Sequence, residues 1–274
     1  EGGLTAQAGR YHLFLAWNCP WAHRAFLTRL FKGLEEATSV SFAEPRRTED
    51  GWMFEESGRY SDGVLGVSAL HEIYARVEPA YTGRITVPVL WDMERGVAVS
   101  NESADIVQML DAAFDQGPEL FPDDLLQEIE RWNECIYRTV NNGVYRAGFA
   151  RTQEAYDRAA HEVFETLDAI EDQLGTTRYL TGERFTACDL RLFPTLARFD
   201  VAYHYAFKCN IRRLQDYPNL WAYAREIYQM PGVADTVRFE IYKAGYFSPS
   251  PLRNPLGIVP AGPIINWNQS HNRN

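Results

Sequence analysis

The sequence predicts a small α/β unit with a mixed sheet, followed by an all-helical unit. Short apolar strands alternate with helical patterns up to Gln116-Gly117-Pro118, where the composition changes. From Leu125 to Tyr246 the sequence has no strand pattern. The length of 274 residues is sufficient for two such domains. We expect them at 1–117 and 118–247, with a Pro-rich tail over 248–274.

The first domain is expected to open with a strand, a helix and a second strand. Tyr11–Trp17 is an aromatic and aliphatic run without a turn residue, which is typical of a buried strand. Asn18-Cys19-Pro20 ends this strand, and Pro20 occupies the favoured first position of a helix over Trp21–Phe31. Val40–Ala43 is expected to form the second, short strand.

A long insertion is expected over 44–84. Its first part, 44–66, is charged and Gly-rich, which predicts a long loop that is either functional or disordered. Its second part contains a helix over 68–77. Two short strands and one helix then complete the domain. They are expected at Val87–Trp91, at Val97–Ser100, and from Asn101-Glu102-Ser103 to Phe114.

The second domain carries only helical signals before its tail. The stretch 125–175 is helical in pattern and holds no proline. Thr186-Ala187-Cys188-Asp189 has the spacing of an N-cap signal and opens the apolar segment Leu190–Phe199, so Asp189 is expected to be a buried capping residue. Further helices are expected after Asp216-Tyr217-Pro218 and after Met230-Pro231-Gly232. The tail is expected either to drape over another part of the protein or to be mobile.

The composition argues against several classes of function. The formal net charge is −10, and an acidic chain without a long Lys/Arg run is poorly suited to binding nucleic acid. No stretch approaches the roughly 18 apolar residues of a membrane span, and no leader is expected from the first residues. The four cysteines lie far apart, so reduced thiols and a cytoplasmic location are expected. The six histidines show no metal-ligand spacing, so no metal is expected.

Cys19 lies between the first strand and the first helix, at the predicted N-cap. Unpaired backbone N–H groups and the positive end of the helix dipole point at such a residue. This setting can lower a cysteine pKa from roughly 8.5 to between about 3.5 and 7.5, so Cys19 is a candidate nucleophile, with a small buried hydrophobe as the alternative. Position 22 is Ala rather than a second cysteine, so an external thiol must release any adduct. Cys135, Cys188 and Cys209 are expected to be structural.

Two further features accompany Cys19. A cis Val87–Pro88 bond would turn the backbone groups of Val87 outward to pair with an extended peptide, whereas an ordinary edge-strand proline is the alternative. Glu102 and Ser103 stand at a helix start, where Ser103 suits a ligand carboxylate and Glu102 suits an ammonium group, with a simple helix cap as the alternative. A thiolate, a strand edge and such a clamp together match a γ-glutamyl tripeptide thiol.

These features, followed by an all-helical half, resemble a cytosolic glutathione transferase over essentially the whole chain. The chain is most similar in motif to the glutathionyl-hydroquinone reductases, also called Xi-class glutathione transferases. The motifs of the first domain are Arg10-Tyr11-His12-Leu13, Cys19-Pro20-Trp21-Ala22-His23-Arg24, Gly51-Trp52, Tyr81-Thr82-Gly83-Arg84, Val87-Pro88-Val89-Leu90-Trp91-Asp92 and Ser100-Asn101-Glu102-Ser103-Ala104. Those of the second are Asn141-Asn142-Gly143-Val144-Tyr145, Phe207-Lys208-Cys209-Asn210, Asp216-Tyr217-Pro218-Asn219-Leu220-Trp221 and Asn254-Pro255-Leu256-Gly257-Ile258-Val259-Pro260.

The resemblance implies a thioredoxin-like domain, a helical domain, a homodimer, and glutathione as co-substrate. It implies an enzyme that removes glutathione from glutathionyl-hydroquinones, with a second glutathione leaving as the disulfide. Cys19 is then the nucleophile. The residues implied to hold glutathione are Trp52, Arg84, Val87, Glu102 and Ser103. Trp17 and Asn18 are less typical of the family and are expected to alter the rim of the site.

The resemblance also places Tyr145, Tyr246 and Tyr242 in a quinol pocket. Breaking an aryl C–S bond by attack on sulfur leaves carbanion character on the ring, and a keto tautomer spreads that charge onto oxygen. The hydroxyls of Tyr145 and Tyr246 are suited to stabilise this oxygen. Core packing is the alternative for any one of the 15 tyrosines.

Two other functions remain open from the sequence. One is an Omega-like thiol transferase that reduces mixed disulfides or dehydroascorbate and also needs Cys19. The other is a transferase-like domain kept only for binding or assembly. The segments around Trp52 and the tail favour the quinol reductase over the first. The joint presence of Cys19, Val87-Pro88 and Glu102-Ser103 argues against the second.

Overall fold

The structure, a computed structural model, describes residues 3–273. The chain divides into two compact units, with the boundary between Pro118 and Glu119. In the described part, the first unit contains a four-stranded sheet and three helices, and the second contains helices without a strand. The predicted fold class, an α/β half followed by an all-helical half, is confirmed. No helix in the described ranges is long and apolar enough to cross a membrane.

The sheet of the first unit is mixed, as predicted. Its strands are β1 (Tyr11–Ala16), β2 (Thr38–Ala43), β3 (Val89–Asp92) and β4 (Val97–Ser100), in the order β2-β1-β3-β4. β1 runs parallel to β2 and antiparallel to β3, which in turn pairs antiparallel with β4. Every residue of β1 is buried, because this central strand is covered on both faces.

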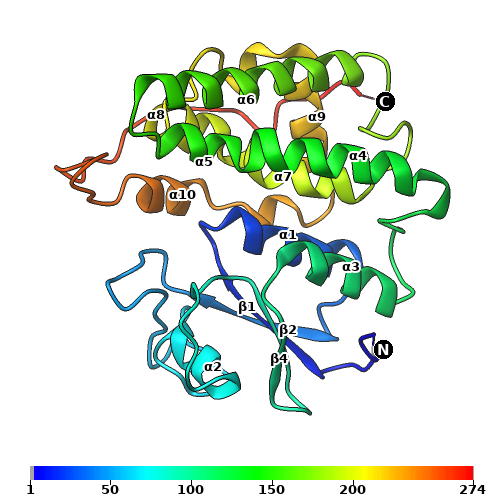
Figure 1. Ribbon diagram of the computed structural model, residues 1–274. Coiled ribbons are helices and arrows are strands. Elements are labelled where there is room, and N and C mark those ends of the chain that lie inside the picture. The colour runs from blue at the N-terminus through cyan, green and yellow to red at the C-terminus, as the bar shows by residue number, and fades with distance from the viewer. Residues whose placement is uncertain (1–2, 274) are drawn as a thin grey trace. The chain divides into compact units, whose positions relative to one another are not determined.

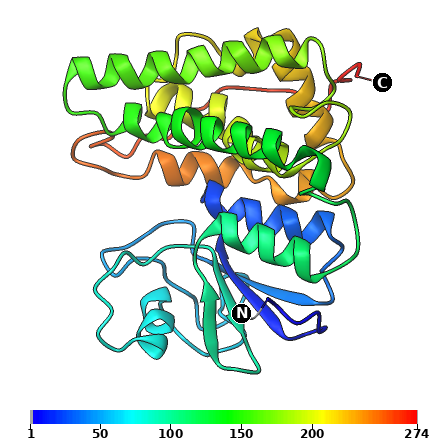
Figure 2. The ribbon, with the colours of Figure 1, turned by 45° about the vertical axis from the view of Figure 1, so that its right-hand side comes forward.

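Three helices cover the sheet. Helices α1 (Pro20–Phe31) and α3 (Ser103–Ala113) lie side by side on one face, and α2 (Leu70–Val77) lies beyond the other (Figures 1 and 2). Pro20 begins α1, where its missing N–H has no helical partner to lose. Ala25 of α1 and Leu110 of α3 are fully buried in the same hydrophobic core as Leu13 of β1. This shared core holds α1 and α3 against each other on the sheet.

The stretch between β2 and α2 forms the predicted long loop. In the described structure its only pairing consists of isolated bridges, such as that between Met53 and Ala69. Asp62 organises its second half, because its buried carboxylate accepts the N–H groups of Val64, Leu65 and Val67 at 3.3, 2.9 and 2.8 Å. These bonds satisfy backbone donors that would otherwise require a helix or a strand.

The second unit contains helices of very different lengths. They are α4 (Leu126–Ile136), α5 (Gly143–Gly148), α6 (Gln153–Leu174), α7 (Ala187–Arg198), α8 (His204–Ala206), α9 (Pro218–Tyr228) and α10 (Phe239–Tyr246). Turns of 3₁₀ helix occupy Asp123–Leu125, Leu214–Asp216 and Ala234–Thr236, and π-helical turns occupy Tyr137–Asn141 and Phe199–Tyr203. The long helix α6 packs against α5 and α9, and α7 packs against α4 and α9.

The predicted helical stretch 125–175 contains three separate helices. The π-helical turn Tyr137–Asn141 follows α4, and the Thr152 hydroxyl begins α6 by accepting the N–H of Ala155 at 3.2 Å. Gly148, at the end of α5, allows Phe207 to approach, since a Cβ there would lie 2.3 Å from the phenylalanine ring. Packing at Gly148 and the Thr152 cap therefore set where α5 ends and α6 begins. Because this stretch holds no proline, the sequence pattern does not reveal these interruptions.

Helix α7 begins at the predicted N-cap signal. Thr186 and Asp189 form a capping box, and Asp189 is fully buried. The Asp189 carboxylate accepts the N–H groups of Leu180 and Thr186 at 3.0 and 2.9 Å and the Tyr223 hydroxyl at 2.8 Å. Burial raises the pKa of Asp189 to about 6. Asp189 therefore ties α7 to α9, as expected of a residue that helps this unit to fold.

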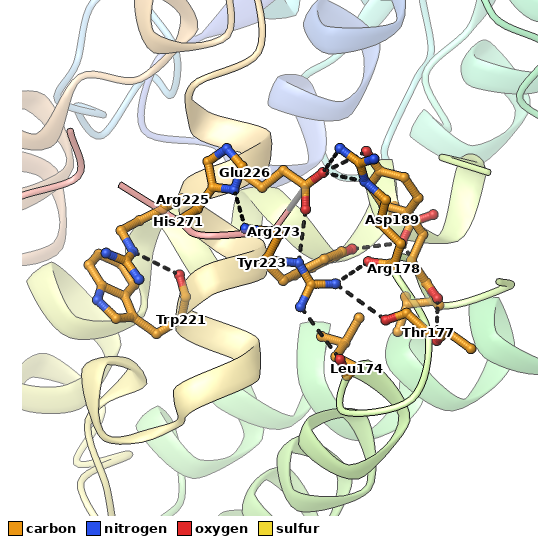
Figure 3. Close-up of polar contacts among 12 residues, drawn as sticks. Leu174, Thr177, Arg178, Asp189, Trp221, Tyr223, Arg225, Glu226, His271 and Arg273 are labelled. Carbon is orange, nitrogen blue, oxygen red and sulfur yellow. Dashed lines mark hydrogen bonds and ion pairs between the residues drawn. The ribbon is translucent and has the colours of Figure 1, made fainter. Parts of the chain in front are cut away.

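The end of the Pro-rich tail is fastened to the helical unit. Trp267 is buried, and its ring centre lies 4.8 Å from that of Trp221 and 5.4 Å from that of Phe239. Figure 3 shows the Arg273 guanidinium, which donates to Glu226 of α9 at 2.9 Å and to the Thr177 carbonyl at 3.3 Å. Of the two expectations for the tail, the structure supports the one in which it drapes over another part.

Candidate active site

Cys19 is the N-cap of α1, as the sequence predicts. Its Sγ accepts the Ala22 N–H at 3.4 Å, so the thiol sits against the first turn of the helix. The Cys19 side chain is partly exposed, whereas Cys188 and Cys209 are buried. Burial raises the pKa of both buried thiols, that of Cys209 to about 12. Cys19 therefore combines access with donors that favour a thiolate, and the buried thiols are inert at neutral pH.

The start of β3 lies against Cys19. The Val87–Pro88 peptide bond is cis, which is one of the two arrangements considered for this pair. The Cys19 thiol donates to the Val87 carbonyl at 3.6 Å, and Val87 is buried two residues before the start of β3. A peptide paired with the backbone of Val87 would therefore carry its own thiol close to Cys19.

Glu102 and Ser103 stand at the N-terminus of α3. The exposed carboxylate of Glu102 accepts the N–H of Ala104 at 3.3 Å. Ser103 is buried, and its hydroxyl donates to Glu102 at 3.4 Å and accepts from Nη1 of Arg24 at 3.5 Å. The two contacts of the Glu102 carboxylate, at 3.3 and 3.4 Å, are long for hydrogen bonds, so a ligand's carboxylate and ammonium groups can replace them at small cost.

The two other residues assigned to glutathione lie on the insertion. Trp52 is buried, and its carbonyl accepts the N–H of Leu70, the first residue of α2, at 2.8 Å. Arg84 is exposed, and its carbonyl accepts the Tyr81 hydroxyl at 3.2 Å. Its guanidinium forms no hydrogen bond or ion pair within residues 3–273, which leaves it available to a ligand carboxylate. The glutathione-binding roles of both residues stay predictions.

The two residues before Cys19, Trp17 and Asn18, have different surroundings. Trp17 stacks on Phe42 with ring centres 4.1 Å apart and meets Phe26 edge-on at 5.6 Å. Asn18 donates from Nδ2 to the Pro45 carbonyl at 2.9 Å. Trp17 is therefore a core residue, and Asn18 is the member of the pair that fastens the long loop beside Cys19.

Three tyrosine hydroxyls of the helical unit meet in one group. The hydroxyls of Tyr145, in α5, and Tyr246, the last residue of α10, lie 2.7 Å apart. The Tyr203 hydroxyl lies 3.0 Å from that of Tyr246 and 3.5 Å from that of Tyr145. Tyr203 is fully buried, whereas Tyr145 and Tyr246 keep some exposure. We refer to Tyr145, Tyr203 and Tyr246 as the tyrosine cluster.

Phe207 forms an apolar wall of the tyrosine cluster. Its ring centre lies 5.2 Å from that of Tyr145, 5.3 Å from that of Tyr203 and 5.5 Å from that of Tyr246. Burial raises the pKa of Tyr203 well above its ordinary value, so this hydroxyl keeps its proton. Since each hydroxyl has one proton to donate, the tyrosine cluster can present a donor to a negatively charged oxygen.

Tyr203 is the residue of the cluster that sequence reasoning missed. It ends the π-helical turn Phe199–Tyr203, within an apolar stretch that reads as ordinary core. A second π-helical turn, Tyr137–Asn141, precedes α5 and Tyr145. Such turns are frequent at functional sites, but their register cannot be read from a side-chain pattern. Tyr145 itself lies within α5.

Tyr242 takes a different position from the tyrosine cluster. It is fully buried within α10, and its hydroxyl donates to the Thr236 carbonyl at 3.4 Å. The guanidinium carbon of Arg198, which is also fully buried, lies 3.8 Å from the centre of the Tyr242 ring. The role of Tyr242 in a quinol pocket stays a prediction.

No metal centre is found in the part of the chain that the structure describes, where no three His, Cys, Asp or Glu side chains are grouped to hold an ion. His23, one turn into α1, is buried. Its backbone N–H donates to the Cys19 carbonyl at 3.1 Å. His23 thus belongs to the packing of α1.

Two family patterns match the chain. The N-terminal domain of the glutathione S-transferases matches residues 18–113, and their C-terminal domain matches residues 153–226. The first range includes Cys19 and Glu102, and the second includes Tyr203. Tyr145 and Tyr246 lie outside both ranges.

Individual relatives match both units. Glutathionyl-hydroquinone reductase YqjG of Escherichia coli (strain K12) is 46% identical over 99% of this chain and 85% of its own length. Glutathionyl-hydroquinone reductase PcpF of Sphingobium chlorophenolicum is 44% identical over 96% of this chain and 86% of its own. The glutathione-bound structure of YqjG covers 100% of this chain and 91% of its own, with a TM-score of 0.96 at 45% identity. A Xi-class transferase from Natrialba magadii covers 100% and 87%, with a TM-score of 0.96 at 43% identity.

Proposed function

This chain belongs to the glutathionyl-hydroquinone reductases, the Xi class of glutathione transferases, and we propose that it removes glutathione from glutathionyl-hydroquinones. Glutathione is its co-substrate. The observation that carries the proposal is Cys19 at the N-terminus of α1, with Ala22 where a second cysteine would stand. A thiolate in this position can take glutathione from a substrate, and a second glutathione is needed to release it.

In the first half-reaction, the Cys19 thiolate attacks the glutathione sulfur that is bonded to the quinol ring. A disulfide bond forms between Cys19 and glutathione, and the bond between ring carbon and sulfur breaks. The electron pair of that bond passes to the ring carbon, which takes up a proton, and the hydroquinone leaves. The ring carbon is reduced and the two sulfur atoms are oxidised.

In the second half-reaction, the thiolate of another glutathione attacks the glutathione sulfur of this mixed disulfide. Glutathione disulfide leaves and Cys19 returns to its thiolate. The sum converts one conjugate and one glutathione into one hydroquinone and one glutathione disulfide. The Ala22 N–H and the start of α1 favour the thiolate in both half-reactions, first as nucleophile and then as leaving group.

Glutathione binding is assigned to the remaining predicted residues of the first unit. Ser103 and the start of α3 would receive the γ-glutamyl carboxylate, and Glu102 the ammonium group. The backbone of Val87 would pair with the cysteinyl residue, which supports attack at the sulfur by Cys19. Trp52 and Arg84 would complete the binding surface from the insertion.

The tyrosine cluster is assigned to the quinol oxygens. When the substrate takes its keto form, the charge that develops during cleavage of the C–S bond spreads onto a ring oxygen. Tyr145 and Tyr246 keep exposure and can donate to this oxygen, while the buried Tyr203 holds their hydroxyls in place. The apolar wall of Phe207 suits an aromatic ring.

The test is turnover of glutathionyl-menadiol with added glutathione. We expect menadiol and glutathione disulfide in equal amounts. Mass spectrometry before glutathione is added should show one glutathione on Cys19. An adduct on Cys135 instead, or a chain that binds glutathione but releases no menadiol, contradicts the proposal. Faster reduction of a simple glutathione mixed disulfide or of dehydroascorbate would favour the Omega-like alternative.

The assembly and location of the protein complete the proposal. The family resemblance supports a homodimer, and reduced thiols support a cytoplasmic location. Sedimentation equilibrium should give twice the mass of the chain. A monomer at micromolar concentration contradicts the dimer.

A further inference from the structure

A buried arginine links the helix that carries the nucleophile to the helix start assigned to glutathione. Arg24 is on α1, one turn beyond its N-cap Cys19, and is 2% exposed. Its Nη1 lies 3.5 Å from Oγ of Ser103, the first residue of α3. Its guanidinium carbon also lies 4.3 Å from the ring centre of Trp21. The charge is therefore placed behind the start of α3, away from solvent.

This contact determines what the Ser103 hydroxyl can do. A guanidinium has five N–H donors and no acceptor, so the Ser103 oxygen must accept from Arg24. The serine's own proton is then directed to another partner. In the structure that partner is Glu102, at 3.4 Å, which is a long contact. A carboxylate placed at the start of α3 would be a better acceptor for the same proton.

Electrostatics act in the same direction. The start of α3 carries partial positive charge from its unpaired N–H groups. A fixed cation behind Ser103 adds to this potential, and it is worth more in a buried setting than at the surface. A hydroxyl that donates, beside N–H groups that donate, with a cation behind them, suits an anion.

We propose that Arg24 is a positioning residue for glutathione, which aims the Ser103 hydroxyl at the α-carboxylate of the γ-glutamyl residue. The inference rests on the proposed function, because it takes the start of α3 to be the γ-glutamyl site. It adds a residue that touches no atom of glutathione and acts through Ser103. The specificity it supplies is for peptides that carry a free α-carboxylate at that end.

The molecule offers a matched control for a purely structural role. Lys32, at the C-cap of α1, pairs with Asp111 of α3 at 2.9 Å, and its side chain is 5% exposed. Like Arg24, Lys32 is a buried cation that connects α1 with α3. It lies at the opposite ends of these helices from Cys19 and Ser103. Loss of either cation should loosen the packing of α1 on α3, and only loss of Arg24 should change the choice of ligand.

The experiment compares Arg24→Met with Lys32→Met by calorimetric titration. The ligands are glutathione and γ-aminobutyryl-cysteinyl-glycine, which lacks only the α-carboxylate of the γ-glutamyl residue. We expect Arg24→Met to weaken binding of glutathione about tenfold, as for one charge-assisted hydrogen bond, and to leave binding of the analogue unchanged. Lys32→Met should affect both ligands equally. Equal weakening of both ligands by Arg24→Met overturns the proposal.

A double-mutant cycle separates this inference from the proposed function. If Arg24 acts through Ser103, then Arg24→Met should cost much less in a Ser103→Ala background than in the wild type. Equal costs in both backgrounds overturn the inference while leaving the γ-glutamyl site intact. Unchanged glutathione affinity in both Ser103→Ala and Glu102→Ala overturns the site itself. Should Arg24→Met not fold, Arg24→Gln carries the same test, because it removes the charge and keeps a polar side chain.

Discussion

The helix starts of the two units differ in how far they are exposed. In the N-terminal unit, Cys19 and Glu102 cap α1 and α3 and keep exposed surface. In the helical unit, Asp189 completes the capping box of α7 with Thr186 at full burial, where Leu180 and Tyr223 also donate to it. The local physics is the same, since an acceptor side chain meets unpaired N–H groups. Exposure leaves Cys19 and Glu102 accessible to a ligand, whereas full burial confines Asp189 to contacts within the fold.

The units also build their chemical groups differently. In the first unit, Cys19, Val87 and Glu102 lie at the ends of helices and strands, where unpaired backbone groups can take part in binding. The tyrosine cluster uses side chains from α5, the turn after α7, and α10, which meet only through packing. Substitution should therefore affect ligand handling in the first unit, and either ring chemistry or stability in the second.

The largest effect is expected for Cys19→Ala. Loss of the nucleophile should reduce turnover of glutathionyl-menadiol on the order of 10⁴-fold or more and abolish the glutathione adduct. Because Cys19 is partly exposed, the thermal midpoint of unfolding should change little. Cys135→Ala is the matched control, since that thiol is also partly exposed. Comparable losses of turnover in both variants would contradict the role of Cys19 as the nucleophile.

Tyr246→Phe should come next. It removes a hydroxyl from the tyrosine cluster and keeps the ring, so kcat with glutathionyl-menadiol should fall on the order of 10²-fold. Reduction of a small glutathione mixed disulfide needs no ring oxygen stabilised and should survive. Tyr242→Phe is the control, because its hydroxyl bonds Thr236 rather than the cluster. An equal loss of kcat in Tyr242→Phe would place that residue in the pocket, and unchanged kcat in Tyr246→Phe would make it a packing residue.

Glu102→Ala tests the exposed start of α3, where Glu102 is the N-cap. Losing the partner of the ammonium group should raise the KM for glutathione about ten- to a hundredfold, with kcat largely kept. The exposed position of Glu102 predicts a small change in stability. Steady-state kinetics at varied glutathione measures both parameters. A fall in kcat at unchanged KM would mean that Glu102 acts in the chemistry instead.

The buried start of α7 predicts a pH effect on the stability of the protein. Burial raises the pKa of Asp189 to about 6 from its ordinary 3.8, so the native state binds its proton more tightly than the unfolded chain. This group therefore contributes a stability that is fully present below pH 4 and is lost as the pH rises to about 6. The loss should be about 3 kcal/mol. Urea unfolding of wild type and Asp189→Asn should show the stability difference between them shrinking by this amount over that range, and a constant difference contradicts it.

The parts of the site that the sequence predicted share one property. Cys19, Val87 and Glu102 each stand where one element ends and the next begins, and such junctions leave local signals such as a proline, a cap or a break in periodicity. The structure brings the Cys19 thiol to the Val87 carbonyl, and it places the Ser103 hydroxyl against the Glu102 carboxylate. Arg24 lay within a recognised motif, but its contact with Ser103 depends on how α1 packs on α3.

Local sequence patterns by themselves determined the strands of the sheet, the helix starts at Cys19, Glu102 and Thr186, and the division into an α/β half and a helical half. Backbone propensity, hydrophobic periodicity and capping all act over a few residues, so they are written in consecutive letters. Only the tertiary structure decided that Tyr203 joins Tyr145 and Tyr246, and that Tyr242 does not. Which of several similar rings meet is settled by close packing between segments far apart in the chain, and no local pattern records it.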